Sequence, residues 1–361
     1  MKILVISTPI FKLPCTGYSG LEHLAYQQAA GLAKKGHQVS IVAPDGSECP
    51  GVTVIPIGPE RQVDERTAYQ KYWQELLKFD VILDHTWLKW ALSLKMEGQL
   101  KAPVLCWCHA PVSTMFQSLP NVEKPCFVCI SEDQKSHFEA LFGREARVCH
   151  NGVDPDFYRP LGIPRTKRFL FLARFSTIKG PDLAIEACRK AGVGLDLVGD
   201  TSITQEPDFL KKCTEMCDGT SLRTGRSRLA CPEDHDHSKD IILQGPATRG
   251  ETVHWYSQAH CLLHPNQRFR EPLGLAPLES MLCETPVIAW RFGAMKKTVK
   301  EGISGFLVNS LDEIINLIKT DAVNTIDRKK CREWAAEHFS LERMINRVES
   351  LALEAEATGG W

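Results

Sequence analysis

Short apolar runs alternate along the chain with longer segments in which apolar residues recur at helical spacing. In the first part the apolar runs are 3–7, 39–43, 52–56, 81–84, 104–107, 126–130 and 146–149. The segments of helical character that lie between several of them are 21–35, 67–77 and 132–142. Runs that are apolar throughout are typical of parallel strands buried on both faces and joined by crossover helices. The pattern therefore predicts a doubly wound α/β domain.

The same pattern begins again after a proline-rich stretch that contains Pro155, Pro160 and Pro164. The later apolar runs are 169–174, 195–199, 241–244, 261–264, 287–290 and 305–308, with helical segments such as 181–190 between them. We therefore predict two Rossmann-like domains, 1–160 and 161–361, that face a ligand-binding cleft. The second domain would contain a polar insertion near 205–238 and end in a helix at 328–357.

Composition narrows the class of protein. The chain has 361 residues, of which 43% are hydrophobic and 24% charged, and its net charge is −1. These values are ordinary for a soluble two-domain protein and argue against a nucleic-acid partner. No apolar stretch approaches the roughly 18 residues of a membrane span, and the first residues do not resemble a secretory signal. We therefore expect a cytoplasmic protein whose 14 cysteines are reduced.

Two carboxylates, Glu271 and Glu279, flank the expected start of a helix. Pro272 and Gly274 suit a tight turn, which would place Gly274 and Leu275 at the helix N-terminus. Free backbone N–H groups at such a terminus bind anions such as phosphate, and the carboxylates could accept hydrogen bonds from sugar hydroxyls. The pattern suggests a site for a nucleotide-sugar. The alternative is an ordinary helix start with Glu279 on a solvated face.

Three other segments carry candidate ligand-binding residues. Arg174 and Lys179 lie in one loop after an expected strand, where they could clamp a diphosphate. Gly17 and Gly20 lie in the loop before the first long helix, where glycine lets a backbone approach a ligand closely. His109 follows an expected strand and could donate to a sugar hydroxyl. Each segment also fits an ordinary surface or structural role, and the same holds for His85, which follows another expected strand.

Metal-binding patterns occur only in the polar insertion. Asp234 and Asp236 form a D-x-D motif, which could bind a metal ion. The alternative is that they belong to an ordinary polar loop. The ligand types of a zinc site also occur there: Cys213, Cys217 and Cys231 with His235 or His237. We expect no metal at the catalytic site.

Taken in order, these segments resemble the retaining glycosyltransferases of family 4, which have the GT-B fold. The matching pieces, spread over residues 1–310, are the glycine loop, NGVD at 151–154, RFSTIKG at 174–180, EPLGLAPLE at 271–279, TPVIAW at 285–290 and EGISGFLV at 301–308. The resemblance implies that Glu271 contacts the donor sugar and Glu279 the ribose. It also implies that Arg174 and Lys179 bind the diphosphate and that His109 lies beside the sugar.

The resemblance implies a donor that is a uridine, guanosine or adenosine diphosphate-sugar, an acceptor glycan or small molecule, and no cofactor. The chain departs from the family pattern at RFGAMKKTV, where Met295 and Lys296 stand in place of a Gly-Gly-x-Pro-Glu loop. Specificity therefore stays open. Membrane association and oligomeric state are open as well. A nucleotide-sugar epimerase and a non-catalytic sugar-nucleotide sensor are the alternatives. A nicotinamide-dependent oxidoreductase is disfavoured, because residues 7–20 lack G-x-G-x-x-G spacing.

Overall fold

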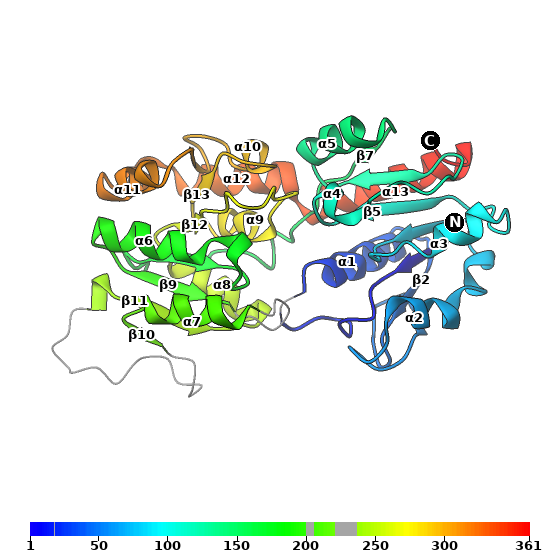
Figure 1. Ribbon diagram of the computed structural model, residues 1–361, viewed down its shortest axis with the longest axis horizontal. Helices are drawn as coiled ribbons and strands as arrows, with labels where there is room; N and C mark the ends of the chain where they lie inside the picture. Colours follow the sequence, from blue (N-terminus) through cyan, green and yellow to red (C-terminus); the bar gives the residue numbers. More distant parts are fainter. Residues whose placement is uncertain (18, 200–205, 221–236) are drawn as a thin grey trace. The chain divides into compact units, whose positions relative to one another are not determined.

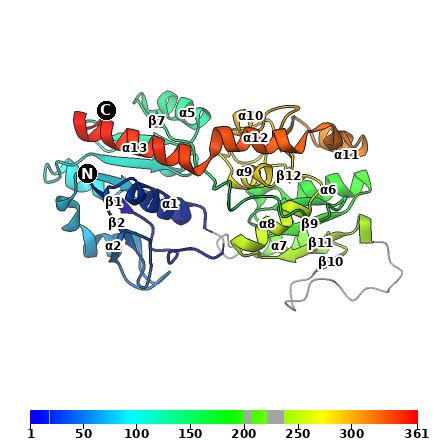
Figure 2. The same cartoon turned by 180° about the vertical axis from the view of Figure 1, so that it is seen from behind.

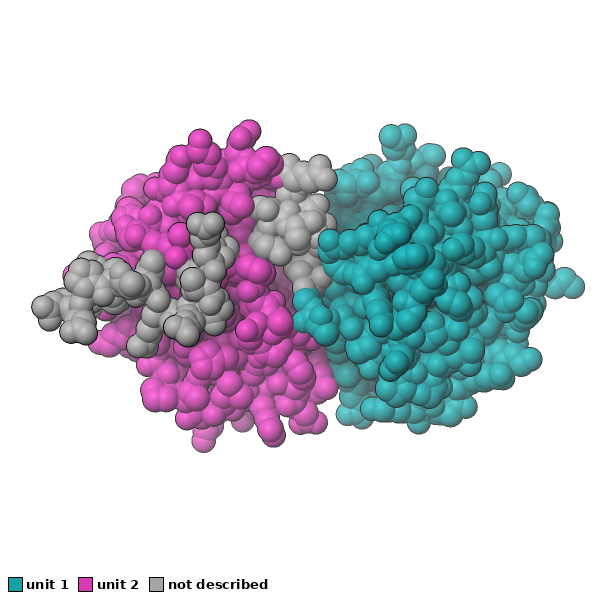
Figure 3. Space-filling model, turned by 90° about the horizontal axis from the view of Figure 1, so that it is seen from below, with its two compact units in different colours: residues 1–152, 339–361 teal, residues 153–338 magenta. Residues whose placement is uncertain are grey.

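The computed structural model describes residues 1–17, 19–199, 206–220 and 237–361. These residues form two compact units, which are residues 1–152 together with 339–361, and residues 153–338 (Figure 3). We call them unit 1 and unit 2. Each unit contains a seven-stranded sheet with helices around it (Figure 1). The prediction of two doubly wound α/β domains is therefore confirmed.

Unit 1 is built on a sheet in which every strand pair is parallel. Its strands are β1 (Lys2–Ile6), β2 (Gln38–Ala43), β3 (Thr53–Pro56), β4 (Val81–Asp84), β5 (Val104–Cys108), β6 (Cys126–Cys129) and β7 (Arg147–Val148). Their order is β3-β2-β1-β4-β5-β6-β7. The direction of winding reverses between β1 and β4, so the loops after these two strands diverge. In doubly wound sheets ligands bind beside such a reversal, at the carboxyl ends of the strands.

The helices of unit 1 are α1 (Leu21–Lys34), α2 (Glu65–Tyr72), α3 (Ala91–Met96), α4 (Val112–Met115), α5 (Glu132–Phe142) and α13 (Leu341–Thr358), with the 3₁₀ helix η1 (Glu75–Lys78). The expected helix at 67–77 is thus divided between α2 and η1. Helix α5 has the bounds expected from the sequence, because Ser131 caps its start and Gly143 ends it in a left-handed conformation.

The end of the chain returns to unit 1. Helix α13 lies beside α1 (Figure 2), and a Cβ added to Gly31 would come within 2.6 Å of Ile345. Lys35 also pairs with Glu349 at 2.7 Å. The expected domain 161–361 therefore differs from unit 2 at its end. The expected helix at 328–357 is broken at Ser340, whose side chain caps α13.

In the described part of unit 2, every strand pair is again parallel. Its strands are β8 (Phe169–Leu172), β9 (Leu195–Val198), β10 (Gly219–Thr220), β11 (Ile241–Gly245), β12 (Leu262–His264), β13 (Val287–Trp290) and β14 (Gly305–Val308). Their order is β10-β11-β9-β8-β12-β13-β14, so the winding reverses between β8 and β12.

The helices of unit 2 are α6 (Pro181–Ala191), α7 (Pro207–Glu215), α8 (Arg249–Gln258), α9 (Leu275–Leu282), α10 (Met295–Thr298), α11 (Leu311–Lys319) and α12 (Arg328–Phe339), the last ending at the boundary with unit 1. The described residues of this unit also form three 3₁₀ helices: η2 (Thr177–Lys179), η3 (His237–Lys239) and η4 (Ala322–Thr325). No helix of the described residues is long and apolar enough to cross a membrane.

The polar insertion is described only in part. It contributes the helix α7 and the two-residue strand β10, and only the strand was not anticipated from the sequence. Cys213 is buried, and the Cys217 thiol donates to the Cys213 carbonyl oxygen at 3.2 Å. Residues 221–236, which carry the D-x-D motif and two of the proposed zinc ligands, lie outside the described residues. Both metal-site hypotheses therefore remain untested predictions.

Candidate active site

Lys179 and Glu271 meet where the winding of the unit 2 sheet reverses. Lys179 ends η2 after β8, and Glu271 follows β12. The Lys179 ammonium donates directly to Glu271 Oε2. Asn266 Nδ2 donates to the same oxygen at 3.3 Å, and His264 Nε2 lies 3.8 Å from it. Oε1 accepts no hydrogen bond from any residue that the structure describes, so it is the carboxylate oxygen left for a ligand.

The protonation states around Glu271 follow from burial and charge. Burial by itself would raise the pKa of Glu271, but the charge of Lys179, with smaller contributions from His264 and the hydrogen bonds, outweighs it, so the pKa lies below its ordinary value. Burial lowers the pKa of His264 to about 4, against a smaller opposing effect of Glu271. At neutral pH, Glu271 is therefore ionised and His264 is neutral.

The neutral state of His264 predicts a pH-dependent stability. Its pKa is about 4 in the folded protein and near the ordinary 6.5 in the unfolded chain. The unfolded chain therefore binds the extra proton between these values, and stability is lost as pH falls through this window. Between pH 7 and pH 5 the loss is about 2 kcal/mol. His264→Asn should remove this contribution to the pH dependence of the unfolding free energy, as measured by urea unfolding at pH 7 and pH 5. Equal pH dependence of the two proteins would contradict the assignment.

The loops that carry Lys179 and Glu271 are fastened to each other. Arg268 donates to both oxygens of Asp182 at 3.0 Å, in the bidentate geometry that holds a guanidinium in one orientation. The same guanidinium donates to the Thr177 carbonyl at 3.1 Å. Gly180 has a φ of +72°, and an added Cβ there would lie 3.1 Å from the Pro265 carbonyl oxygen. These contacts fix the Lys179 loop against residues 265–271.

Arg174, the other cation expected at this loop, follows the end of β8 and is half-buried. Gly274 caps the start of α9 with a φ of +84°, a conformation that favours glycine. No side chain of the described residues caps this helix, and its first turn, which begins at Leu275, contains no acidic residue. The first N–H groups of α9 are therefore not satisfied by a capping side chain.

The loop after β13 supports the backbone of Glu271. Ala294 N donates to the Glu271 carbonyl at 3.0 Å. Gly293 has a φ of +60°, and an added Cβ there would lie 2.7 Å from the same carbonyl oxygen. Met295 is buried, and its methyl group lies 3.0 Å from the place of a Cβ on Gly274. Met295, one of the residues that depart from the family pattern at this loop, therefore packs beside Gly274.

Gly293→Ala is expected to destabilise unit 2 more than replacing a left-handed glycine whose added Cβ would contact nothing. Gly192 provides that control, because its φ is +73° and an added Cβ would meet nothing within 4 Å. The left-handed conformation costs a non-glycine residue roughly 1–2 kcal/mol. The clash with Glu271 should bring the loss for Gly293→Ala to about 3 kcal/mol or more. Urea unfolding of both variants tests this, and equal losses would show that the loop yields without strain.

Glu279 lies in a polar cluster that does not include Glu271. Its Oε2 accepts from the Tyr256 hydroxyl at 2.9 Å, and its Oε1 lies 3.8 Å from Arg249, which also donates to the Tyr158 hydroxyl at 3.2 Å. Burial, reinforced by the charge of Glu279, raises the pKa of both tyrosines. Glu279 is buried, so the alternative that it lies on a solvated face is wrong. No hydrogen bond joins the two glutamates among the described residues.

In unit 1, His109 follows β5 and pairs with His85, which follows β4. His85 Nδ1 lies 2.9 Å from His109 Nε2. His85 is fully buried, whereas His109 is half-buried. Burial, with a smaller contribution from the charge of Lys89, lowers the pKa of His109 to about 3. Burial also holds the pKa of His85 well below its ordinary value. Both rings are therefore neutral at neutral pH.

The glycine loop between β1 and α1 is fixed mainly by Glu22. This carboxylate accepts from Ser19 Oγ at 2.7 Å and from Thr8 Oγ1. Gly20, at the N-cap of α1, has an ordinary helical φ of −80°. A Cβ added to Gly17 would meet nothing within 4 Å. Conformation therefore does not require glycine at position 20, and crowding among the described residues does not require it at position 17. The role of both glycines toward a ligand stays a prediction.

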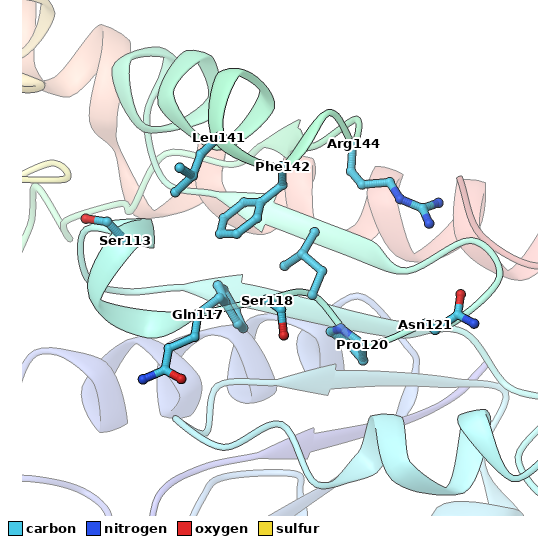
Figure 4. A pocket seen from close by; sticks show the side chains of 10 residues that line it. Ser113, Gln117, Ser118, Pro120, Asn121, Leu141, Phe142 and Arg144 are labelled. Atoms are coloured by element: carbon cyan, nitrogen blue, oxygen red, sulfur yellow. The ribbon is translucent and has the colours of Figure 1, made fainter.

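A separate hollow of about 720 Å³ lies in unit 1 between the segment after α4 and the end of α5 (Figure 4). Phe116 and Phe142 meet edge to face in its wall, with ring centroids 6.2 Å apart. Arg144 lies at its rim (Figure 4). The lining contains no carboxylate, histidine or cysteine. The hollow therefore offers no acid–base pair and is not a candidate active site.

Sequence reasoning missed several residues that these sites contain. Asn266 and His264 hold Glu271, while Tyr256 and Arg249 surround Glu279. His264 could have been found, because it is a polar residue at the end of an apolar run. Tyr256 and Arg249 lie on α8 and give no such signal, since only the packing of α8 against α9 brings them to Glu279.

Comparison with known families identifies the protein class. Residues 156–338 match the family model of glycosyl transferases group 1, and residues 18–157 match that of Glycosyltransferase Family 4. The chain belongs to the group 1 glycosyltransferases and is an enzyme of this class. The resemblance seen in the sequence is confirmed.

Individual relatives and solved structures agree with this family. The chain is 24% identical to D-inositol 3-phosphate glycosyltransferase 1 of Catenulispora acidiphila over 86% of this chain and 83% of the relative. It is also 24% identical to a D-inositol 3-phosphate glycosyltransferase of Mycobacterium tuberculosis, over 96% and 82% of the chains. Sucrose-phosphate synthase of Thermosynechococcus elongatus superposes with a TM-score of 0.79, 18% identity and 99% coverage of both chains. Anabaena HepE in complex with UDP-glucose superposes with a TM-score of 0.72 and 18% identity, over 97% of this chain and 98% of HepE. The GT-B fold is thus confirmed.

Proposed function

We propose that this enzyme transfers a sugar from a nucleoside diphosphate-sugar to an acceptor hydroxyl with retention of anomeric configuration. The observation that carries the proposal is the asymmetry of Glu271. One of its oxygens is held by Lys179, and the other accepts nothing from the described residues. Helix α9, whose N-terminus has no capping side chain among the described residues, begins four residues later along the chain. A carboxylate, a cation and free amide groups suit a sugar joined to a diphosphate.

The diphosphate would be bound by Lys179, Arg174 and the first amides of α9 at Gly274 and Leu275. An ammonium has three N–H donors, so Lys179 could keep its contact with Glu271 and still bind phosphate. As the bond to the sugar breaks, negative charge grows on the departing diphosphate. Fixed positive groups that are already in place stabilise that charge most effectively.

The sugar would be bound by Glu271 through its Oε1, which would accept a hydrogen bond from a sugar hydroxyl. Glu279 would accept from the ribose. His109 in unit 1 would contribute a hydrogen bond to the sugar. We propose no covalent intermediate on Glu271, because the ammonium and amide donors on Oε2 reduce its nucleophilicity. NMR of the glycoside product would test retention, since inversion would change the anomeric coupling.

The nature of the donor and acceptor is supported by the relatives. HepE was solved with UDP-glucose, and the named relatives are glycosyltransferases of D-inositol 3-phosphate. The experiment that tests the function is a screen of UDP-, GDP- and ADP-sugars with nucleotide release as the signal, with inositol phosphates among the acceptors. Release that requires an acceptor supports transfer. A changed sugar without an acceptor would identify the epimerase, and binding without turnover would identify the sensor.

A further inference from the structure

We propose that His85 is a positioning residue that fixes the tautomer of His109, so that His109 presents an N–H donor, and not a lone pair, to its ligand. The ligand atom would then be an oxygen that accepts a hydrogen bond, such as a hydroxyl or ring oxygen of the donor sugar. The tautomer follows from the described residues alone. Only the nature of the ligand rests on the proposed glycosyl transfer.

The two rings meet edge to edge. His85 Nδ1 and His109 Nε2 are 2.9 Å apart, while the ring centroids are 5.1 Å apart and the planes differ by 29°. This combination places the contact close to the plane of both rings, where an imidazole N–H and a lone pair point. The ring of His85 is also held by Trp107, whose ring centroid lies 4.9 Å away with the two planes 25° apart. The contact is therefore a directed hydrogen bond between the two imidazoles.

A hydrogen bond between two neutral imidazoles contains one proton, so there are two arrangements. In the first, His85 Nδ1–H donates to His109 Nε2. In the second, His109 Nε2–H donates to His85 Nδ1, and the proton of His85 then lies on its Nε2. That nitrogen is buried and has no hydrogen-bond partner. The second arrangement would therefore bury an N–H group that lacks an acceptor, which folded proteins rarely do.

The charge of Lys89 favours the first arrangement as well. Lys89 is buried and donates to the carbonyl oxygens of Asp84 and Thr86, the two neighbours of His85. Its charge is felt at both imidazoles, where it opposes protonation. A nearby cation favours a bare lone pair on the unpartnered nitrogen of His85 over an N–H group. Asp84 Oδ1 accepts from Thr86 and lies 3.8 Å from Lys89, so the carboxylate offsets part of this charge, and the missing acceptor at His85 Nε2 carries more weight.

The first arrangement decides what His109 offers. With Nε2 accepting from His85, the proton of His109 is on Nδ1. That nitrogen has no partner among the described residues, and the side chain is only half-buried. His109 therefore offers one hydrogen-bond donor and cannot take a proton from an acceptor hydroxyl through Nδ1. Its role would be to bind and orient an oxygen, and not to act as a general base.

NMR of protein labelled with ¹⁵N-histidine tests the tautomer directly, because protonated and bare ring nitrogens have distinct shifts. The His109 signals would be assigned by their loss in His109→Gln. We expect Nδ1–H in the wild-type protein. His85→Phe keeps an aromatic ring against Trp107 but removes the donor, and should move His109 toward the Nε2–H form that free histidine favours. His85→Asn places an amide N–H near the position of Nδ1 and should restore the Nδ1–H form.

Transfer rates give a second measurement. His85→Phe should lower kcat/KM by about tenfold, as expected for one lost hydrogen bond, while His85→Asn should stay near the wild-type value. An Nε2–H tautomer in the wild-type protein, or an unchanged tautomer in folded His85→Phe, would overturn the proposal. If no sugar donor supports turnover, the proposed function fails while the NMR result still decides the role of His85. Unchanged far-ultraviolet circular dichroism verifies that the variants fold.

Discussion

Replacing Glu271 by glutamine is expected to lower sugar transfer about ten- to a hundredfold while leaving the affinity for free nucleoside diphosphate nearly unchanged. A hydrogen bond to a charged group contributes roughly 1.5–3 kcal/mol. The variant loses that contribution only where the sugar is present. Lys179 would lose its carboxylate partner, so the phosphate contact should be preserved or slightly strengthened.

Calorimetry with the nucleoside diphosphate and initial rates with one working donor make the pair of measurements. Glu186→Gln is the matched control, because Glu186 is a partly exposed glutamate of the same unit and pairs with Lys190 at 2.7 Å. It should change neither quantity. If Glu271→Gln weakens nucleotide binding as strongly as removal of Lys179 does, Glu271 is not a sugar-side residue and the assignment of the site is wrong.

Lys179→Ala should weaken nucleoside diphosphate binding by about ten- to a hundredfold and slow transfer as well, because the ammonium would contact the diphosphate before and during bond cleavage. It should also destabilise unit 2. Glu271 is buried, and without Lys179 its carboxylate lacks a countercharge. Removing one partner of a buried pair typically costs about 3–5 kcal/mol.

The two effects of Lys179→Ala can be separated. In the double variant Lys179→Ala with Glu271→Gln the stranded charge is gone, so stability should largely return while nucleotide affinity stays low. Acid should also reduce the stability cost of the single variant. Without Lys179, burial acts on Glu271 with less opposition and raises its pKa relative to the wild type, so the neutral carboxyl forms at a higher pH. Lys190→Ala, which removes an exposed pair, is the control. Stability that fails to return in the double variant would contradict this account.

The sheets were predictable because their chemistry is local. A strand buried on both faces of a parallel sheet must be apolar along its length, and runs such as 104–107 and 287–290 meet that condition. The strand β10 has only two residues, Gly219 and Thr220, and gives no run to detect. The break at Ser340 was detectable in principle, since a serine before an apolar-periodic segment is a typical N-cap.

The sequence allowed the residues of the candidate site to be proposed from the loops in which they lie, but not their contacts with distant helices. Lys179 and Glu271 could be proposed from loops after strands, and the structure brings them into contact. The surroundings of Glu279 could not be read from spacing, because they depend on how α8 packs on α9. The contact between His85 and His109 was within reach, since β4 and β5 are neighbours in the sheet and each histidine follows the end of its strand.

The return of α13 to unit 1 has a consequence for the order of synthesis. Unit 2 is one continuous segment, 153–338, whereas unit 1 needs both 1–152 and 339–361. A ribosome therefore releases every residue of unit 2 before unit 1 can close its surface around Gly31 with Ile345. The unit that begins first is completed last. A shortened chain that stops at residue 338 would thus contain an intact unit 2, while the α1 surface of unit 1 would lack the helix that covers it.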